Sequence, residues 1–202
     1  KFRRVNSLWH PIHLCPPHRY ITRSVGLHSF QPTSVVDELP EPLDHQAFLA
    51  LVTRGPLIAI DLIVRNSRGE TLLGLRRNAP ARGTWFVPGG RVYKNESLDA
   101  AFRRISESET GIQMERATAR FAGVHEHFYD DNFASRPGIG THYITLAYIV
   151  EYRSRELLFL PQEQHSGYRW MAEREICAAC DVHANCKAYF QAIRADANSV
   201  AA

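Results

Sequence analysis

The segment between residues 90 and 112 has residue types and spacings that could hold a metal ion. Its glycines and polar residues follow the pattern Gly90-x5-Glu96-x7-Arg104-x4-Glu109-x-Gly111-Ile112. Glu109 offers a carboxylate just before the Gly111 stop, and Gly89 and Gly90 let backbone carbonyls approach a ligand closely. A carboxylate and a bare carbonyl suit a hard, oxygen-preferring cation such as Mg²⁺ or Mn²⁺. Taken alone, Glu109 would more often be a solvated helix charge, and its spacing from both glycines favours a ligand instead.

A helix must carry Glu109 to that site. In residues 97–110 apolar side chains recur at steps of three and four, at Leu98, Ala101, Phe102 and Ile105. This period predicts an amphipathic helix with one packed face and one wet face, ending at Gly111.

The remaining patterns predict strands and helices in alternation. Residues 57–64 are typical of a buried strand, 66–69 of a tight turn and 71–76 of the partner strand in a hairpin. Further expected elements are strands at 85–87, 119–127, 142–152 and 167–171, a polar loop at 128–140 and a final helix at 184–193. This order predicts an α/β fold, an α/β/α sandwich with a mixed central sheet.

The chain has the size and balance of one globular domain. Its 202 residues are 45% hydrophobic and 22% charged, which is enough to bury a substantial core. We expect a disordered extension at residues 1–40, the domain at 41–196 and a frayed tail at 197–202; a transit peptide is the weaker alternative for the extension. No run of eighteen apolar residues occurs, so we expect a soluble protein without a membrane span.

The net charge of +3 is concentrated at the N-terminus. Residues 1–36 contain five Lys or Arg and no carboxylate, which leaves the rest of the chain slightly negative. A protein that binds nucleic acid broadly usually has a clustered basic surface, so that class is disfavoured. Any anionic ligand should be small and locally held.

The cysteine pattern disfavours a secreted disulfide framework. Cys15, Cys177, Cys180 and Cys186 are unevenly spaced, so a reducing cytoplasm is the simpler expectation. The last three form a run with His183 at every third position, as soft-metal ligands could. On a continuous helix such steps drift by about 60° each, so the four side chains would not converge. We therefore expect buried free cysteines there rather than a metal site.

The spacing around Glu109 resembles the Nudix box, the signature of hydrolases that act on nucleoside diphosphates linked to another group. That box usually has Arg-Glu, an aliphatic residue, any residue and Glu-Glu, where this chain has Arg104-Ile105-Ser106-Glu107-Ser108-Glu109. Ile105 and Ser108 thus stand where the family has metal-binding glutamates, which argues against a cluster of several metal ions. Arg104 is expected to pair with a carboxylate and so hold the helix and the loop together.

Several other strings are similar to the GDP-mannose mannosyl hydrolase branch of that family, over about residues 42–190. They are Trp85-Phe86-Val87-Pro88-Gly89-Gly90-Arg91-Val92, His127-Phe128-Tyr129-Asp130-Asp131-Asn132-Phe133, Thr141-His142-Tyr143, Leu160-Pro161-x-Glu163-Gln164-His165 and Val182-His183-Ala184-Asn185. The resemblance implies a Nudix-type sandwich that hydrolyses GDP-mannose, and possibly GDP-glucose, to GDP and the free sugar. Water would attack the sugar C1 with inversion.

The resemblance also implies a metal site and a general base. One Mg²⁺ or Mn²⁺ per subunit would be held by the Gly89 carbonyl, Glu109 and Gln164. His165 would be the general base, and an imidazole with an unperturbed pKa of about 6.5 suits that task near neutral pH. Gln164 beside it would place the metal-held diphosphate and the base in one frame.

Five further side chains match substrate positions of the family. Arg76, Arg91 and Tyr143 would stabilise the negative charge that develops on the β-phosphate as GDP leaves. Asp61 and His127 would hold the sugar or support its positive character as the glycosidic bond breaks. Either arginine could instead be a surface cation of little energetic value.

A third group of residues matches nucleotide contacts made across a homodimer interface, namely Pro42, Leu43 and Phe48. The loop aromatics could stack on guanine, contact a second subunit or simply pack the loop; they are Phe128, Tyr129 and Phe133.

Two other functions remain open. An ordinary Nudix pyrophosphatase would attack phosphorus and give GMP and mannose 1-phosphate. A non-catalytic nucleotide-sugar sensor would bind without turnover, although Gln164, His165, Glu109 and Arg76 together argue for an enzyme. In each case the expected partner is a small molecule rather than a nucleic acid or a membrane.

Overall fold

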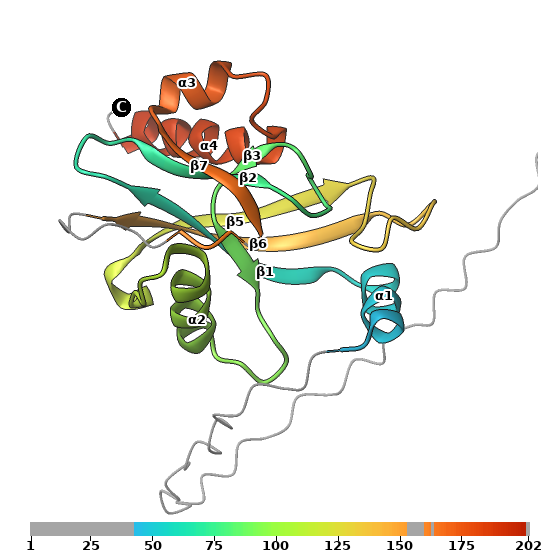
Figure 1. Ribbon diagram of the computed structural model, residues 1–202. Helices are drawn as coiled ribbons and strands as arrows, with labels where there is room; N and C mark the ends of the chain where they lie inside the picture. Colours follow the sequence, from blue (N-terminus) through green and yellow to red (C-terminus); the bar gives the residue numbers. More distant parts are fainter. Residues whose placement is uncertain (1–42, 153–159, 163, 201–202) are drawn as a thin grey trace, which may run out of the picture. The chain divides into compact units, whose positions relative to one another are not determined.

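The computed structural model describes residues 43–152, 160–162 and 164–200 (Figure 1). The predicted extension at 1–40 and Pro42 lie outside these residues. In chain order the elements are α1 (His45–Arg54), β1 (Leu57–Arg65), β2 (Thr71–Arg76), β3 (Trp85–Phe86), β4 (Gly89–Arg91), α2 (Leu98–Thr110), the 3₁₀ turn η1 (Arg116–Thr118), β5 (Arg120–Tyr129), β6 (Thr141–Glu151), β7 (His165–Met171), α3 (Glu173–Ala178) and α4 (Ala184–Val200).

The strands form one mixed sheet in the order β3-β2-β1-β6-β5, with β4 paired to β1 and β7 paired to β2. β1 and β6 are parallel over residues 57–65 and 143–151, and the other pairs are antiparallel. β1 is central and apolar on both faces, so it must be covered on both sides. The predicted mixed sheet is confirmed.

A helical layer covers each face of the sheet (Figure 1). Ile60, Leu62 and Val64 of β1 pack with Phe102 and Ile105 of α2. On the opposite face, a second buried cluster joins β1, β2, β6 and β7 to α3 and α4, through residues that include Ile63, Leu73, Ile149, Ile176, Tyr189 and Phe190. The predicted α/β/α sandwich is therefore confirmed.

Helix α2 begins and ends where the sequence predicts. The Ser97 side chain accepts a hydrogen bond from the Ala100 N–H at 3.1 Å and caps the first turn. Gly111 ends the helix with φ 74°, a left-handed conformation that favours glycine. The period of apolar residues and these two end signals are local, which explains why the sequence alone predicts the helix.

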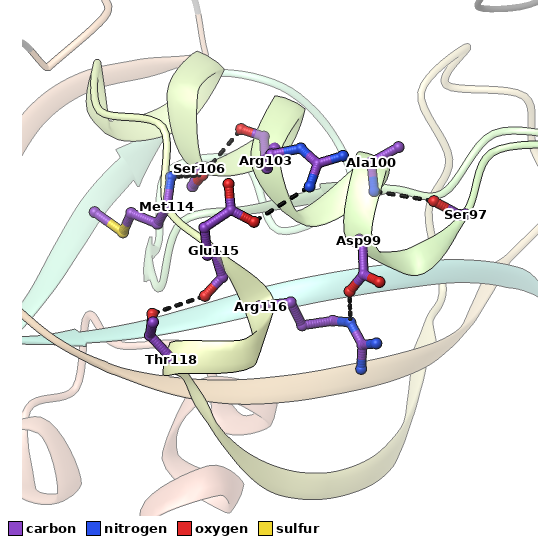
Figure 2. Close-up of polar contacts among 9 residues, drawn as sticks. All are labelled: Ser97, Asp99, Ala100, Arg103, Ser106, Met114, Glu115, Arg116 and Thr118. Carbon is purple, nitrogen blue, oxygen red and sulfur yellow. Dashed lines mark hydrogen bonds and ion pairs between the residues drawn. The ribbon is translucent and has the colours of Figure 1, made fainter. Parts of the chain in front are cut away.

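The segment that follows α2 is tied back onto the helix (Figure 2). Glu115 pairs with Arg103 at 3.2 Å, and Arg116 pairs with Asp99 at 2.6 Å. The buried Ser106 hydroxyl accepts a hydrogen bond from the Met114 N–H at 2.9 Å. Exposed ion pairs contribute at most about 1 kcal/mol each, so the buried hydroxyl and the apolar face of α2 fix its position more firmly.

Several elements differ from the sequence prediction. β4, α1 and α3 were not predicted, because two glycines or a short helix give little periodic signal. β7 begins at His165 rather than at residue 167, and α4 continues to Val200, past the predicted end at residue 193. The domain boundaries at 41 and 196 stay a prediction. Within the described residues, no helix is long and apolar enough to cross a membrane.

The cysteine run extends over α3, the segment between α3 and α4, and the start of α4, rather than over one helix. α3 ends at Ala178 and α4 begins at Ala184, so the argument from a continuous helix does not apply. Cys186 is buried in the core, Cys177 is half-buried and Cys180 is exposed, and all three are free. Among the described residues, no group of three or more His, Cys, Asp or Glu could hold a metal ion.

We expect Phe102→Ala to lower the free energy of unfolding by about 3–5 kcal/mol, because Phe102 is fully buried between α2 and the sheet. The neighbouring Arg103→Ala removes only a partly exposed ion pair and should cost no more than about 1 kcal/mol. Urea unfolding of both variants measures the difference. Equal losses would contradict the assignment of the packed face.

Candidate active site

A cavity of about 340 Å³ opens between the sheet, α1 and the end of α2. This volume lies in the range of small-molecule sites. Of the sequence-predicted residues, the cavity is lined by Phe48, Asp61, Arg76, Gly89, Arg91, Glu109, His127, Tyr143 and Gln164. Leu43 is 54% exposed, and neither it nor His165 lines the cavity. The tertiary structure thus gathers most of the predicted site from seven elements and the segment before β7.

One part of the wall offers oxygen atoms of the kind a hard cation prefers. Glu109 is buried in the last turn of α2, and Gly89 and Gln164 line the same cavity. A carboxylate, a backbone carbonyl and an amide oxygen together fit Mg²⁺ or Mn²⁺, which accept oxygen ligands and retain water molecules. The donor set therefore fits the metal that the resemblance implies.

Gly89 cannot be replaced without moving its neighbours. It pairs with Asp61 across β1 and β4, and an added Cβ would lie 2.1 Å from Asp61 Oδ1 and 2.8 Å from the Ile60 carbonyl oxygen. Gly90 is also tight, since a Cβ there would lie 3.1 Å from Ile105. The two glycines thus allow β4 to lie directly against the central strand.

Asp61 is a buried carboxylate at the cavity wall, with 8% of its surface exposed. Its Oδ2 accepts a hydrogen bond of 2.5 Å from the Tyr189 hydroxyl. Burial raises the pKa of Asp61 to about 6, although the Tyr189 hydrogen bond and the Arg76 charge both act to lower it. Asp61 therefore holds its proton more tightly than an exposed aspartate does.

Arg76 is a cation in the cavity wall. Its Nε donates to the Pro80 carbonyl oxygen at 2.9 Å, which fixes the guanidinium beside the cavity. Its charge acts to lower the pKa values of Asp61, His165 and Tyr143, although burial raises those of Asp61 and Tyr143 overall, so the guanidinium lies close to all three. An anionic ligand in this cavity would meet a fixed positive charge.

Arg91 and two phenylalanines form an aromatic part of the wall. The Arg91 guanidinium lies 3.9 Å from the centre of the Phe48 ring. Phe48 and Phe133 pack with their ring centres 4.4 Å apart, and His45 contacts Phe133 at 5.0 Å. Because α1 supplies Phe48, the unpredicted helix closes this side of the cavity.

His127 lies buried on β5, 3% exposed, and lines the cavity. The Thr145 hydroxyl lies 3.4 Å from its Nδ1, whereas its Nε2 has no hydrogen-bond partner among the described residues. Burial, and then the charges of His125 and His183, lower the pKa of His127 to about 4. The imidazole is therefore neutral at pH 7 and has one nitrogen open to a ligand.

His165 is placed behind the cavity wall rather than on it. It is 1% exposed, and its ring packs against Gly74, where an added Cβ would lie 2.3 Å from the ring. Nδ1 lies 3.2 Å from the Tyr168 hydroxyl and 3.6 Å from Glu109 Oε2. Burial, and then Arg76, lower the pKa of His165 to about 4.

The tautomer of His165 follows from its neighbours. The Tyr168 hydroxyl donates to the Pro161 carbonyl oxygen at 2.6 Å, so its oxygen can accept the Nδ1–H of His165. This places the lone pair on Nε2, which has no hydrogen-bond partner among the described residues. His165 is thus in the neutral form that a base requires, but its accepting nitrogen lies against Gly74.

Arg104 joins α2 to the preceding loop, as the sequence predicts. Its guanidinium donates to both carboxylate oxygens of Glu96, at 2.7 and 2.8 Å, and to the Arg91 carbonyl oxygen at 2.8 Å. It also lies 4.1 Å from the centre of the Tyr93 ring. This partly buried pair keeps the glycine loop and α2 in a fixed arrangement.

Comparison with known proteins identifies the family. A family model described as NUDIX domain matches residues 55–191, which is more than half of the chain. The chain belongs to the Nudix hydrolase family. The family that the Nudix box predicted is thus confirmed.

Similar proteins share part of the sequence or the fold. The Low-salt glycan biosynthesis protein Agl8 of Haloferax volcanii is 43% identical over 102 residues, which are 50% of this chain and 62% of that protein. The MutT protein of Methanosarcina mazei Go1 has a TM-score of 0.57 at 24% identity, over 72% of this chain and 97% of its own. The NUDIX domain of Shewanella oneidensis NrtR, complexed with ADP ribose, has a TM-score of 0.55 at 15% identity, over 77% and 99%. Both structures show the Nudix fold.

Sequence reasoning did not find Tyr189, Thr145 or the role of α1. Tyr189 belongs to a run of apolar residues in α4 that predicts only a buried face, and its partner Asp61 is 128 residues away. Tyr129 and Phe133, left undecided by the sequence, both line the cavity, whereas Phe128 is 66% exposed and stacks on His142.

We expect Gly89→Ala to destabilise the protein by about 1–3 kcal/mol, because the new methyl group overpacks against Asp61 and the Ile60 carbonyl. Gly55→Ala is the control, since an added Cβ there meets nothing within 4 Å and the change should cost less than about 0.5 kcal/mol. Thermal unfolding compares the two. Gly89→Ala with normal stability would argue against the close β1–β4 packing.

We expect the metal-free protein to lose stability as the pH falls from about 6.5 towards 4. The folded-state pKa values of His127 and His165 are lowered to about 4 from 6.5, so the unfolded chain binds more protons in this window. Asp61 opposes the loss, because its pKa is raised from 3.8 to about 6 and the folded state takes up that proton first. Urea unfolding at pH 7 and pH 5 measures the net effect.

His127→Gln removes one of the groups that cause this loss. The variant should therefore lose less stability between pH 7 and pH 5 than the unmodified protein does. If the free energy of unfolding depended on pH in the same way in both proteins, the pKa of His127 would have to be the same in the folded and unfolded states.

Proposed function

We propose that this Nudix protein hydrolyses a nucleoside diphosphate sugar, GDP-mannose with GDP-glucose as a second substrate, to GDP and the free sugar. The observation that carries the proposal is the cavity itself. It places two arginines and a set of oxygen donors beside a buried carboxylate and a buried neutral imidazole, Asp61 and His127. An anionic group and a polar, uncharged group can be bound next to each other in such a site.

The diphosphate would lie at the arginines. Arg76 and Arg91 both line the cavity and can donate charge-assisted hydrogen bonds to phosphate oxygens. A bound Mg²⁺ or Mn²⁺, held by Gly89, Glu109 and Gln164, would supply further positive charge to the diphosphate. The guanine base would lie against the aromatic wall of Phe48 and Phe133, since stacking on such rings stabilises bases.

The sugar would lie at the polar end of the cavity. Neutral His127 and Tyr143 can hydrogen-bond sugar hydroxyls, and burial raises the pKa of Tyr143, which keeps its hydroxyl protonated. The Asp61 carboxylate would stabilise positive charge at C1 in an oxocarbenium-like transition state. These three groups are the part of the site that favours attack at carbon over attack at phosphorus.

The reaction exchanges one bond at the sugar C1. The oxygen of water forms a bond to C1, and the bond between C1 and the β-phosphate oxygen breaks. GDP leaves with that electron pair, and a general base takes the proton from water. Attack from the face opposite the leaving group gives inversion.

His165 is the general base of this proposal. Its neutral state and the lone pair on Nε2 support the role, and proton transfer requires that nitrogen to reach the attacking water. A specific observation supports Asp61 as the alternative base, because Asp61 lines the cavity and its pKa of about 6 lies closer to neutral pH.

The comparisons support the substrate class. The name of the 43% identical relative refers to glycan biosynthesis, a process that consumes sugar donors, and the NrtR domain was crystallised with ADP ribose, a nucleoside diphosphate linked to a sugar. The chain spans 62% of the length of that relative.

We further propose a homodimer, in which the exposed Leu43 beside α1 would contact the second subunit.

Product analysis in ¹⁸O-labelled water tests the function. GDP-mannose and Mg²⁺ should give GDP and mannose with the label in mannose. GMP and mannose 1-phosphate with the label in phosphate would show a pyrophosphatase instead. Tight binding of GDP-mannose without any release of GDP would show a sensor.

Glu109→Gln should raise the concentration of Mg²⁺ needed for half-maximal activity, because a carboxylate is lost.

We expect His165→Gln to lower kcat by roughly 10²- to 10⁴-fold with little change in KM, as loss of a general base does. His142→Gln is the matched control, because His142 is half-buried on β6 and does not line the cavity. Steady-state kinetics with GDP-mannose measure both. An unaltered kcat in His165→Gln, together with a large loss in Asp61→Asn, would transfer the role of base to Asp61.

A further inference from the structure

Tyr189 of α4 lies beneath the cavity wall and contacts side chains that line the cavity. Its hydroxyl donates a 2.5 Å hydrogen bond to Asp61 Oδ2. Tyr189 is fully buried and does not line the cavity. A ligand in the cavity would therefore meet Asp61 rather than Tyr189, and Tyr189 would act on the ligand only through the side chains that it contacts.

The ring of Tyr189 is held on several sides. His125 meets it edge-on with ring centres 4.6 Å apart, His127 lies at 5.4 Å and Phe86 at 6.5 Å. These contacts come from β3 and β5, while the phenol itself belongs to α4. The direction of the hydroxyl is thus set by packing rather than by solvent.

The Asp61 carboxylate is held at both of its oxygens. Oδ2 accepts the Tyr189 hydrogen bond, and Oδ1 lies against Gly89, where an added Cβ would be 2.1 Å away. Rotation of the carboxylate would break the first contact and push against the second. Oδ1 therefore stays beside Gly89, which itself lines the cavity.

We propose that Tyr189 is a positioning residue that orients the Asp61 carboxylate for the reaction. The inference rests on the proposed function, because it assumes that Asp61 acts on the sugar in that reaction. Correct placement of a reacting group is worth a large rate factor, and an error of about 1 Å can cost roughly 100-fold. The Tyr189 hydroxyl supplies a hydrogen bond that fixes the angle of this carboxylate from outside the cavity.

A double-mutant cycle in kcat tests the inference. Tyr189→Phe should lower kcat by roughly 10- to 100-fold with KM changed by less than about twofold. Asp61→Asn should lower kcat further, and Asp61→Asn with Tyr189→Phe should be no slower than Asp61→Asn alone. Independent, multiplying effects on kcat would overturn the proposal, because they would mean that Tyr189 does not act through Asp61.

Tyr148→Phe is the matched control for loss of a buried tyrosine hydroxyl. Tyr148 is 4% exposed in the cluster beside α2, its hydroxyl contacts Arg116 at 3.4 Å, and it does not line the cavity. Its kcat should be unchanged. An equal loss of kcat in Tyr148→Phe and Tyr189→Phe would assign the effect to general loosening of the core.

A second cycle separates this inference from the proposed function. Urea unfolding of the same four proteins measures whether Tyr189 and Asp61 stabilise the fold jointly, and requires no substrate. Coupled losses of stability are expected, and additive losses would overturn the inference. If the unmodified protein does not turn over GDP-mannose, the proposed function is wrong. The coupling of Tyr189 and Asp61 in the free energy of unfolding would still test whether the two side chains stabilise the fold jointly.

Discussion

The burial of one carboxylate in the central strand is the constraint on which the rest of the site depends. β1 runs through the middle of the sheet, so Asp61 lies between the layers rather than in water. A carboxylate taken out of water is costly unless hydrogen bonds and nearby positive charge compensate. Tyr189 supplies the hydrogen bond, Arg76 the charge, and Gly89 the space. Parts of the chain that are distant in sequence are therefore arranged around one ionisable group.

The same burial determines the charge of the cavity at neutral pH. The pKa values of His127 and His165 are lowered to about 4, and burial raises that of Tyr143, so these three side chains are uncharged. The positive charge of the cavity is thus carried by arginines, which stay protonated in any surroundings. An anionic group and a neutral polar group would consequently be attracted to different parts of one cavity.

The Nudix fold alone does not determine the reaction. The framework of α2 is kept, with the Arg104–Glu96 pair at its start and Gly111 at its end. However, Ile105 packs into the core and Ser108 lines the cavity where glutamates usually stand in the box. The helix therefore has fewer carboxylates than the usual box, while Asp61 and His127 of the sheet line the same cavity. This difference is one reason why we propose reaction at the sugar rather than at phosphorus.

The sequence by itself determined what depends on neighbours along the chain. The β1–β2 hairpin, α2 with its cap and its glycine stop, and the residue types of the box all follow from local periods and spacings. Tertiary structure decided the pairing of β4 with β1, the closure of the cavity by α1 and the burial of His165 behind its wall. It also brought Tyr189 to Asp61 across 128 residues. Contacts of that kind leave no local pattern, because only the packing of the layers brings the two residues together.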